Sequence, residues 1–187
     1  MAGMQLSAPA SPEAKPISQL FQTAFTDAAN AEEGTLVAGL VTALLAAPAT
    51  AHVQVFTAQQ DHTLTGCILF SPLHYAQDKR RVALLSPVAV HPDWQGKGVG
   101  SALIRFGLEQ LRLGGTEIAV TYGDPAYYGR FGFRQVTAEE LPPPHPLSQP
   151  AGWQAMTTAD TSTDAASFAP LQGPCTCLQP FDDPALW

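Results

Sequence analysis

Apolar side chains recur along this chain with two different spacings, which predict a mixture of helices and strands. In residues 17–30, 34–51 and 99–113 the apolar positions lie three and four residues apart, as on a helix that packs one face against a core. Shorter, more continuous apolar runs bounded by polar or turn residues predict strands. These runs cover residues 53–57, 64–70, 82–90, 116–122, 131–137, 153–157 and 175–178.

Residues 1–16 depart from this pattern. They are rich in Ala, Ser and Pro and carry almost no large apolar side chains, so we predict a disordered lead before a domain at residues 17–187. They also lack the basic start and the continuous apolar core of a signal peptide. A polar loop is expected at residues 158–167, and the sequence assigns no chemistry to residues 141–187.

Residues 34–51 are long and uncharged enough to raise the question of a membrane span. Thr42 interrupts the segment and Pro48 truncates it. Its apolar residues also form a stripe on one side of a helix, made of Leu36, Val37, Leu40, Val41, Leu44 and Leu45. We therefore predict a helix that lies on a core and no membrane association.

Composition and charge narrow the classes of function. The length of 187 residues suits a single domain, and the net charge of −7 with only 9 Lys and Arg argues against a nucleic-acid surface. Three cysteines and five scattered histidines do not have the spacing of a disulfide framework or a metal site. Reduced cysteines and the lack of a signal peptide predict a cytoplasmic protein without a metal.

The stretch from Val88 to Ser101, VAVHPDWQGKGVGS, indicates a binding site. It reads as the end of a strand, a sharp turn and a glycine-rich loop that opens into a helix. Gly96, Gly98 and Gly100 carry no Cβ atom, so the backbone can approach a ligand closely. The helix start then presents unpaired N–H groups and the positive end of its dipole, which together favour a phosphate or pyrophosphate.

Two common phosphate motifs fit this loop poorly. A dinucleotide fingerprint needs G-x-G-x-x-G and an acidic residue at the end of the next strand, whereas Glu117 stands at the start of that strand. A P-loop needs Ser or Thr directly after its lysine, and Gly98 follows Lys97 here. The segment Gln95–Gly100 instead resembles motif A of the GNAT acetyltransferases, whose loop reads Gln/Arg-x-x-Gly-x-Gly/Ala.

A second stretch, Gly123 to Phe133, resembles the Tyr-x-x-x-Gly-Phe ending of the same family, with Tyr128 in the tyrosine position. Its tandem tyrosines are similar to those of a bacterial subgroup of N-acetyltransferases. The resemblance implies an α/β fold: a single GNAT domain with helices on both faces of a mixed sheet, whose central strands splay apart at the acyl-CoA site. It also implies that backbone groups of this loop bind the pyrophosphate of acetyl-CoA, and that Tyr128 protonates the departing thiolate.

The resemblance assigns cofactor contacts to two short runs of residues, one at the end of the predicted strand and one in the glycine-rich loop with the start of the helix. They are Val88, Ala89, Val90, Gln95, Gly96, Lys97, Gly98, Val99, Gly100 and Ser101. The predicted activity is transfer of an acetyl group from acetyl-CoA to an amine of a small molecule or protein by direct attack, and a homodimer is compatible with it. Two alternatives stay open: a different acyl donor or oxygen acceptor on the same scaffold, and a non-catalytic acyl-CoA-binding module.

The general base is not evident from the sequence. The predicted strand at residues 82–90 carries no carboxylate, although many GNAT enzymes place one on their central strands. Candidates elsewhere are Glu32, Glu33, His74, Tyr75 and Asp124, and the sequence does not choose among them.

Overall fold

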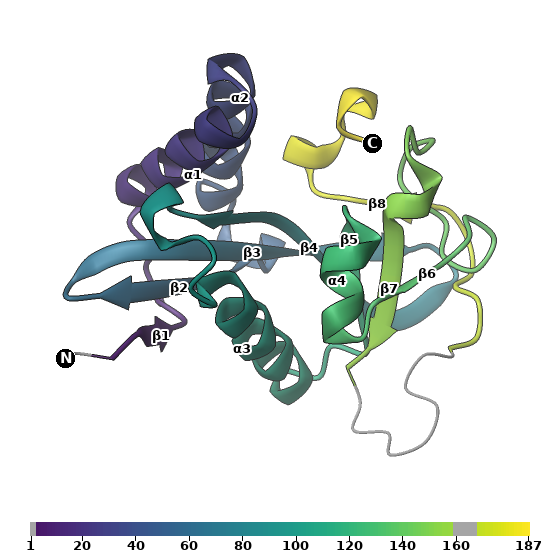
Figure 1. Ribbon diagram of the computed structural model, residues 1–187. Coiled ribbons are helices and arrows are strands. Elements are labelled where there is room, and N and C mark those ends of the chain that lie inside the picture. Colours follow the sequence, from purple (N-terminus) through teal and green to yellow (C-terminus); the bar gives the residue numbers. More distant parts are fainter. Residues whose placement is uncertain (1–2, 159–167) are drawn as a thin grey trace. The chain divides into compact units, whose positions relative to one another are not determined.

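The computed structural model describes residues 3–158 and 168–187 (Figure 1). The predicted polar loop lies outside the described residues except for Thr158. The chain forms two compact units, one made of the residues up to Phe70 with Pro87–Gly107, the other of Ser71–Ser86 with Leu108–Trp187. Strands β3 (Thr63–Tyr75) and β4 (Asp78–Val90) and helix α3 (Val99–Leu113) each run from one unit into the other.

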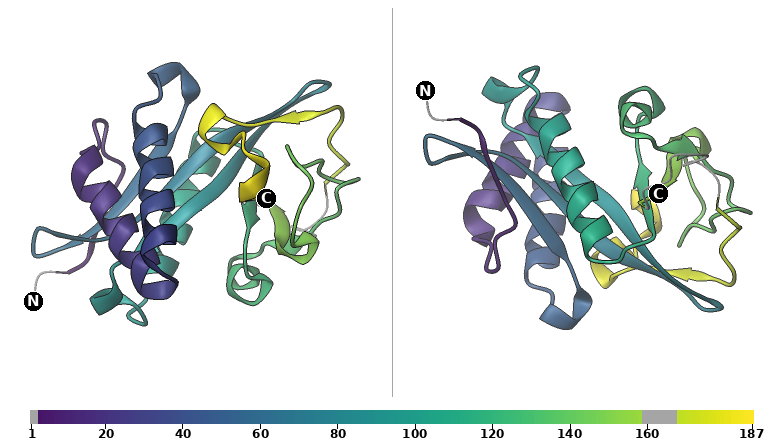
Figure 2. Two further views of the ribbon diagram at one scale, coloured as in Figure 1. Left: turned by 90° about the horizontal axis from the view of Figure 1, so that it is seen from above. Right: turned by 90° about the horizontal axis from the view of Figure 1, so that it is seen from below.

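The strands are hydrogen-bonded in the order β1-β2-β3-β4-β5-β7-β6, and β8 pairs with β3 outside this path. In the first unit, β1 (Gln5–Ser7), β2 (Gln54–Gln60) and β3 pair antiparallel. Helices α1 (Ala14–Ala28) and α2 (Ala31–Leu45) lie side by side on one face of these strands, and the start of α3 lies on the other (Figure 2). The mixed α/β fold with helices on both faces confirms the prediction.

Two glycines bring α3 close to the strands of the first unit. A Cβ atom at Gly66 of β3 would lie 2.8 Å from Cδ1 of Leu103, and one at Gly107 of α3 would lie 2.8 Å from Cε2 of Phe70. Real Cβ atoms essentially never approach so closely, so these positions are restricted to glycine unless neighbours move. The packing fixes the start of α3, and with it the loop before the helix, against β3.

Small and polar residues join α1 to α2. Gly34 lies against Thr26, and the hydroxyls of Ser18 and Thr42 are 2.8 Å apart. The buried part of the predicted stripe is therefore narrower than the sequence suggested: Leu36 is 49% exposed, whereas Val37, Val41 and Leu44 are buried. Leu36 follows Gly34 by two positions, which places it on the opposite side of the helix. Within the described residues, every helix is too short or too polar to cross a membrane.

The N-terminal lead differs from the predicted disorder. Residues Gln5–Ser7 form β1, which pairs with Thr57–Gln59 of β2, and α1 already begins at Ala14. Main-chain hydrogen bonds to a strand edge need no large apolar side chains, so the composition gave no sign of them. The Ser7 hydroxyl adds a 2.8 Å hydrogen bond to the hydroxyl of Thr57.

The second unit contains the remaining strands and a short helix. Its elements are β5 (Ile118–Tyr122), α4 (Pro125–Tyr128), β6 (Arg134–Gln135), β7 (Trp153–Thr157) and β8 (Cys175–Thr176). Short 3₁₀ turns, at Gly129–Phe131, Pro150–Gly152, Gln179–Phe181 and Pro184–Leu186, connect or end them. The strand predicted at residues 131–137 is thus reduced to two residues, because a 3₁₀ turn occupies its beginning.

The parallel pairing of β4 with β5 is short. It joins Val82–Leu85 to Ile118–Thr121 and ends there, although β4 continues to Val90. Pro87 has no N–H group to donate to a ladder, which accounts for an end of pairing at this place. At the last paired position, the Thr121 hydroxyl donates a 3.2 Å hydrogen bond to the carbonyl oxygen of Leu85 and so adds a side-chain link between the two strands.

Candidate functional site

The loop before α3 has the backbone geometry that its glycines predicted. Pro92–Trp94 form a 3₁₀ turn, after which Gly96 and Gly98 adopt φ angles of 71° and 82°. These left-handed angles favour glycine, since other residues pay a steric cost there. A Cβ atom built at either glycine has no neighbour within 4 Å, so the loop surface is open on that side.

Helix α3 opens directly behind these glycines. Its first internal hydrogen bond runs from the N–H of Ala102 to the carbonyl oxygen of Gly98, 3.0 Å away. The N–H groups of Val99, Gly100 and Ser101 precede this bond and have no acceptor within the helix. In a helix of 15 residues they coincide with the positive end of a substantial dipole. Loop and helix together form an anion-binding geometry.

The end of β4 borders this loop. The His91 N–H group donates a hydrogen bond to the carbonyl oxygen of Thr65 in β3, 2.9 Å away. Main-chain groups of successive strand residues point to opposite edges, so the N–H and C=O groups of Val88 and Val90 point away from β3. The Gln95 side-chain amide donates to the Val90 carbonyl at 3.1 Å. The carbonyl oxygen of Val90, a predicted cofactor contact, therefore already accepts a hydrogen bond within the protein. The same bond holds the loop to the end of β4. Ala89 between them is buried.

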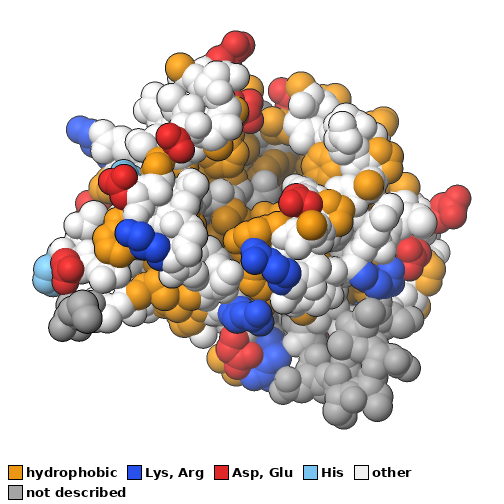
Figure 3. Space-filling model, viewed as in Figure 1, with side chains coloured by type: hydrophobic (Ala, Val, Ile, Leu, Met, Phe, Trp, Pro, Cys, Tyr) orange, Lys and Arg blue, Asp and Glu red, His pale blue; other side chains and the backbone are white. Residues whose placement is uncertain are grey.

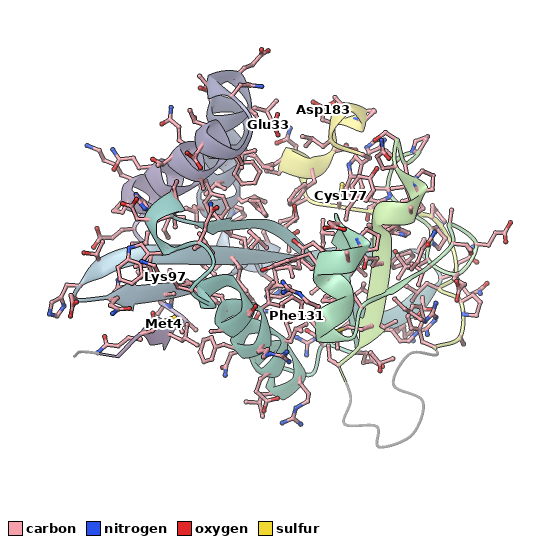
Figure 4. All side chains as sticks on the ribbon, viewed as in Figure 1. Met4, Glu33, Lys97, Phe131, Cys177 and Asp183 are labelled. Atoms are coloured by element: carbon pink, nitrogen blue, oxygen red, sulfur yellow. The ribbon has the colours of Figure 1, made fainter. Side chains whose placement is uncertain are left out.

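Lys97 is exposed on the loop (Figure 4). Its ammonium group lies over the ring of Trp94, 4.9 Å from the ring centre. This cation–π contact holds the ammonium group on the same loop as the two glycines. From this position Lys97 can attract an anion bound at the loop without forming a direct hydrogen bond to it.

Tyr128 lies in the second unit at the end of α4. Asp124 starts this helix, since its carboxylate accepts a 2.9 Å hydrogen bond from the N–H of Ala126, and Pro125 follows as the first helical residue. The Tyr128 ring packs edge-on against Tyr127 and Phe133, with ring centres 5.1 and 5.9 Å apart. Figure 4 labels Phe131, which belongs to the 3₁₀ turn directly after this helix.

The surroundings of Tyr128 keep its phenol protonated. Burial raises its pKa to about 12, while a hydrogen bond with the Thr121 side chain lowers the pKa in part. Burial also raises the pKa of Tyr127, and the Arg130 guanidinium, which lies over its ring, opposes this effect. The two tyrosines thus differ in environment: Tyr128 faces the end of β5, and Tyr127 faces a cation.

A pocket of about 370 Å³ adjoins the turn that leads to Tyr128. The residues that line it come from two segments of the chain: Tyr122, Gly123, Asp124 and Pro125, and Ser148, Gln149, Ala151 and Gly152. The Tyr122 hydroxyl accepts from the Gln149 N–H at 2.7 Å and contacts the Ser148 hydroxyl at 3.1 Å. This pocket therefore has an ordered polar rim and one carboxylate, that of Asp124.

The other candidate bases have structural roles or lie elsewhere. The buried Tyr75 hydroxyl donates to the Pro142 carbonyl at 2.9 Å, and burial raises its pKa. Glu32 and Glu33 lie in the first turn of α2, and His74 is exposed on β3 beside β8. Of the five candidates, only Asp124 is in the turn that leads to Tyr128.

Charged side chains and thiols lie elsewhere on the described part of the chain. On the face shown in Figure 3, Lys and Arg side chains lie among Asp and Glu side chains. Cys67, Cys175 and Cys177 are free thiols, and burial raises the pKa of each. Among the residues that the structure describes, no three His, Cys, Asp or Glu side chains come together as a metal site would require.

Sequence reasoning missed two residues beside Tyr128. Gly123 directly follows β5 and lies against the ring, and a hydrogen bond with the Thr121 side chain lowers the pKa of the phenol in part. Gly123 could have been suspected from its place just before the Asp-Pro helix start. Thr121 carries no local signal, because its contacts reach Leu85, 36 positions earlier in the chain.

Comparison with known proteins agrees with this geometry. The acetyltransferase (GNAT) domain family matches residues 51–135. YjhQ of Escherichia coli K12, an uncharacterized N-acetyltransferase, is 35% identical over 121 residues, which are 63% of this chain and 65% of that protein. YhbS of the same strain, also an uncharacterized N-acetyltransferase, is 34% identical over 76 residues. The chain thus spans 65% and 46% of the lengths of these relatives.

Two solved structures extend the likeness over the whole fold. A GNAT family acetyltransferase from Brucella melitensis in complex with acetyl-CoA is 30% identical, with a TM-score of 0.69 over 97% of this chain and 100% of that one. The Escherichia coli YhbS in complex with CoA is 25% identical, with a TM-score of 0.74 over 97% of this chain and 92% of that one.

Proposed function

Because the chain belongs to the GNAT acetyltransferase family, we propose that it moves an acetyl group from acetyl-CoA to an amine. The observation that carries this proposal is the loop at Gly96–Gly98, which opens into α3 with left-handed glycines and three N–H groups without helical acceptors. The crystallised relatives bound to CoA and to acetyl-CoA support the choice of ligand.

The residues at the loop fit a pyrophosphate. Backbone N–H groups from Gly98 to Ser101 would bind its oxygens, and the ammonium of Lys97 would add attraction. The open space beside Gly96 and Gly98 is where a Cβ atom would otherwise stand. Along β4, the outward peptide groups of Val88 and Val90 would pair with the amide arm of the cofactor.

The chemistry follows from the thioester. The lone pair of an unprotonated amine attacks the acetyl carbonyl carbon, the carbon–sulfur bond breaks, and the sulfur leaves with the bonding electrons. The attacking nitrogen, which is positively charged once the new bond has formed, releases one proton to solvent and becomes the nitrogen of the neutral amide. Tyr128 would assist by offering its phenol proton to that sulfur. Its pKa of about 12 keeps this proton in place near neutral pH.

The two acid strengths limit how far this proton moves. A thiol has a pKa of about 8.5, so full transfer from a phenol near 12 is uphill by about 5 kcal/mol. Tyr128 therefore stabilises the leaving sulfur mainly as a hydrogen-bond donor, and solvent completes the protonation. We expect its contribution to lie at the low end of the 10²–10⁴-fold range of general acids.

The pocket beside Asp124 supports an acceptor site for a cationic amine. Its single carboxylate would attract the protonated form, which loses its proton before attack. Asp124→Asn keeps the helix cap, because asparagine caps as well as aspartate, and removes only the charge. We expect KM for the amine to rise several-fold in this variant while the affinity for coenzyme A stays unchanged.

The activity is tested by incubating the protein with acetyl-CoA and a panel of amines. The proposal predicts release of free thiol that depends on one class of amine, with an acetylated product of matching mass. A non-catalytic binding module would bind acetyl-CoA but release no thiol with any amine. Release only with longer acyl-CoA donors or with alcohols would favour another acyl transfer on the same scaffold.

A further inference from the structure

Two segments of the chain line the proposed acceptor pocket, and hydrogen bonds join them at Tyr122. The Tyr122 hydroxyl accepts from the N–H group of Gln149 at 2.7 Å and lies 3.1 Å from the hydroxyl of Ser148. All three residues line the pocket, which has a volume of about 370 Å³. The position of Tyr122 therefore determines where the wall formed by Ser148 and Gln149 stands.

Trp187 contacts two of these residues from outside the set that lines the pocket. Its ring stacks on the ring of Tyr122, with ring centres 6.2 Å apart and planes at 20°. Its carbonyl oxygen accepts a 2.7 Å hydrogen bond from the N–H group of Ser148. Trp187 thus supports both the side chain of Tyr122 and the main chain of Ser148.

The segment that carries Trp187 is itself anchored (yellow in Figure 1). The buried Trp187 ring packs edge-on against Trp153 and Phe181, with ring centres 5.8 and 6.4 Å away, and its indole N–H donates to the Phe181 carbonyl at 2.9 Å. A polar contact adds a second attachment, since Nε2 of His145 lies 2.8 Å from Oδ1 of Asp182. These contacts leave Trp187 little freedom to move, as a positioning residue requires.

A shift of Trp187 would be passed directly to the pocket. Both contacts reach lining residues, so displacing Trp187 releases the ring of Tyr122 and the main chain of Ser148 together. In a pocket of about 370 Å³, the fit of one methylene group decides about tenfold or more in kcat/KM. The place of this wall therefore limits the size of the amine that fits beside the Asp124 carboxylate.

We propose that Trp187 is a positioning residue that determines the specificity for the amine: by holding Tyr122 and Ser148 it fixes one wall of the acceptor pocket and excludes amines that are too bulky. This proposal rests on the proposed function, which assigns the pocket to the acceptor. Trp187 takes no part in the bond changes of acetyl transfer and acts through the two lining residues. Its loss should therefore change KM and the choice of amine more than kcat.

The first test compares Trp187→Leu with Trp187→Phe on a series of primary amines of increasing size and branching. Leucine keeps an apolar side chain but removes the ring that stacks on Tyr122, and phenylalanine restores an aromatic ring. We expect KM for the best amine of the wild type to rise by up to about tenfold in Trp187→Leu, the range of an aromatic pair, while kcat changes less than about threefold. The kcat/KM ratio between that amine and its bulkier homologues should narrow. Trp187→Phe should restore both quantities within a few-fold.

Phe21→Leu is the matched control. Phe21 is also buried and belongs to a stacked pair, with its ring centre 6.3 Å from that of Phe25 and planes at 22°, but it lies in α1 of the first unit. It should lose stability as Trp187→Leu does and keep the wild-type KM and amine preference. If Trp187→Leu does not fold, Trp187→Met replaces it, because methionine fills irregular apolar space.

The second test does not depend on activity. The amide hydrogens of Ser148 and Gln149 donate to Trp187 and Tyr122, so their hydrogen exchange, followed by NMR, reports on the wall. Exchange at both amides should become roughly tenfold faster or more in Trp187→Leu, slow again in Trp187→Phe and stay at the wild-type rate in Phe21→Leu. Unchanged exchange in Trp187→Leu, or a phenylalanine variant as impaired as the leucine variant, overturns the proposal.

The amine series separates this proposal from the proposed function. A wild-type protein that releases thiol with no amine contradicts the proposed function and the specificity role of Trp187 together. Thiol release by the wild type, with a KM and an amine preference that Trp187→Leu leaves unchanged, contradicts the role of Trp187 alone.

Discussion

A Cβ atom at Gly123 would lie 2.7 Å from Cε2 of Tyr128. The tyrosine ring therefore occupies space that only a glycine at the end of β5 leaves open. The backbone of Gly123 needs no left-handed angle, since its φ is not among the positive ones. Gly123 is required because the Tyr128 ring approaches it closely. A substitution at Gly123 therefore tests whether catalysis depends on the position of that ring.

Gly123→Ala should lower kcat by roughly tenfold, because the added methyl group pushes the Tyr128 ring out of place and small displacements of a reacting group are costly. Coenzyme A affinity, measured by calorimetry, should remain that of the wild type. Gly129→Ala is the control, because Gly129 is next to Tyr128 in the chain and its Cβ would meet no atom within 4 Å. Equal kcat values for the two variants would contradict a role for the ring position.

Tyr128→Phe should cut kcat by roughly a hundredfold while the ring and its packing survive. Tyr127→Phe tests the alternative tyrosine and should stay within a few-fold of the wild type. Steady-state thiol release with the identified amine gives both numbers. The assignment is wrong if Tyr127→Phe is the damaging change, and a Tyr128→Phe variant that mainly unfolds would indicate a packing role only.

The pH dependence of kcat/KM follows from the direction of the Tyr128 pKa. As an acid it acts while protonated, and its pKa of about 12 keeps it protonated well above neutral pH. An amine acceptor with a lysine-like pKa of about 10.4 becomes a nucleophile as pH rises. The profile should therefore rise from pH 7 toward roughly 10 without a falling limb from Tyr128. A falling limb below about pH 9 that Tyr128→Phe abolishes would disprove this.

Deleting residues 1–8 should lower the free energy of unfolding by about 1 kcal/mol, because it removes β1 and the 2.8 Å hydrogen bond between Ser7 and Thr57. Ser7→Ala isolates the side-chain part of this loss. Urea unfolding of the three proteins measures it. A deletion that leaves the unfolding midpoint unchanged would mean that the strand adds nothing, as the composition of the segment suggested.

The sequence predicts best those features that depend on neighbours in the chain. The spacing of Gly96 and Gly98 after a strand and before an apolar helix is local, and the structure has left-handed angles at both. The helices and most strands were likewise located within a few residues by their apolar periodicity. β1 was missed because a three-residue edge strand is held by main-chain hydrogen bonds, which leave no pattern in the side chains.

The unpredicted part of the site comes from contacts between distant residues. The link between Thr121 and Leu85 spans 36 positions and exists because two parallel strands end together. Leu36 matched the apolar stripe and is nevertheless exposed, since Gly34 and Thr42 turn the other side of α2 toward α1. The periodicity of apolar residues predicts which side of a helix is buried. The width of the buried stripe depends on the element that packs against that side.

Calorimetry of Gly98→Val with coenzyme A tests the central claim most directly, because valine at a φ of 82° would distort the loop that is to hold the pyrophosphate. Gly39→Val is the control: Gly39 also has open space for a Cβ atom, but it lies within α2. The account predicts that wild type and Gly39→Val bind coenzyme A and its dephospho form, and that folded Gly98→Val binds neither. Unchanged affinity in Gly98→Val would remove the cofactor site from this loop.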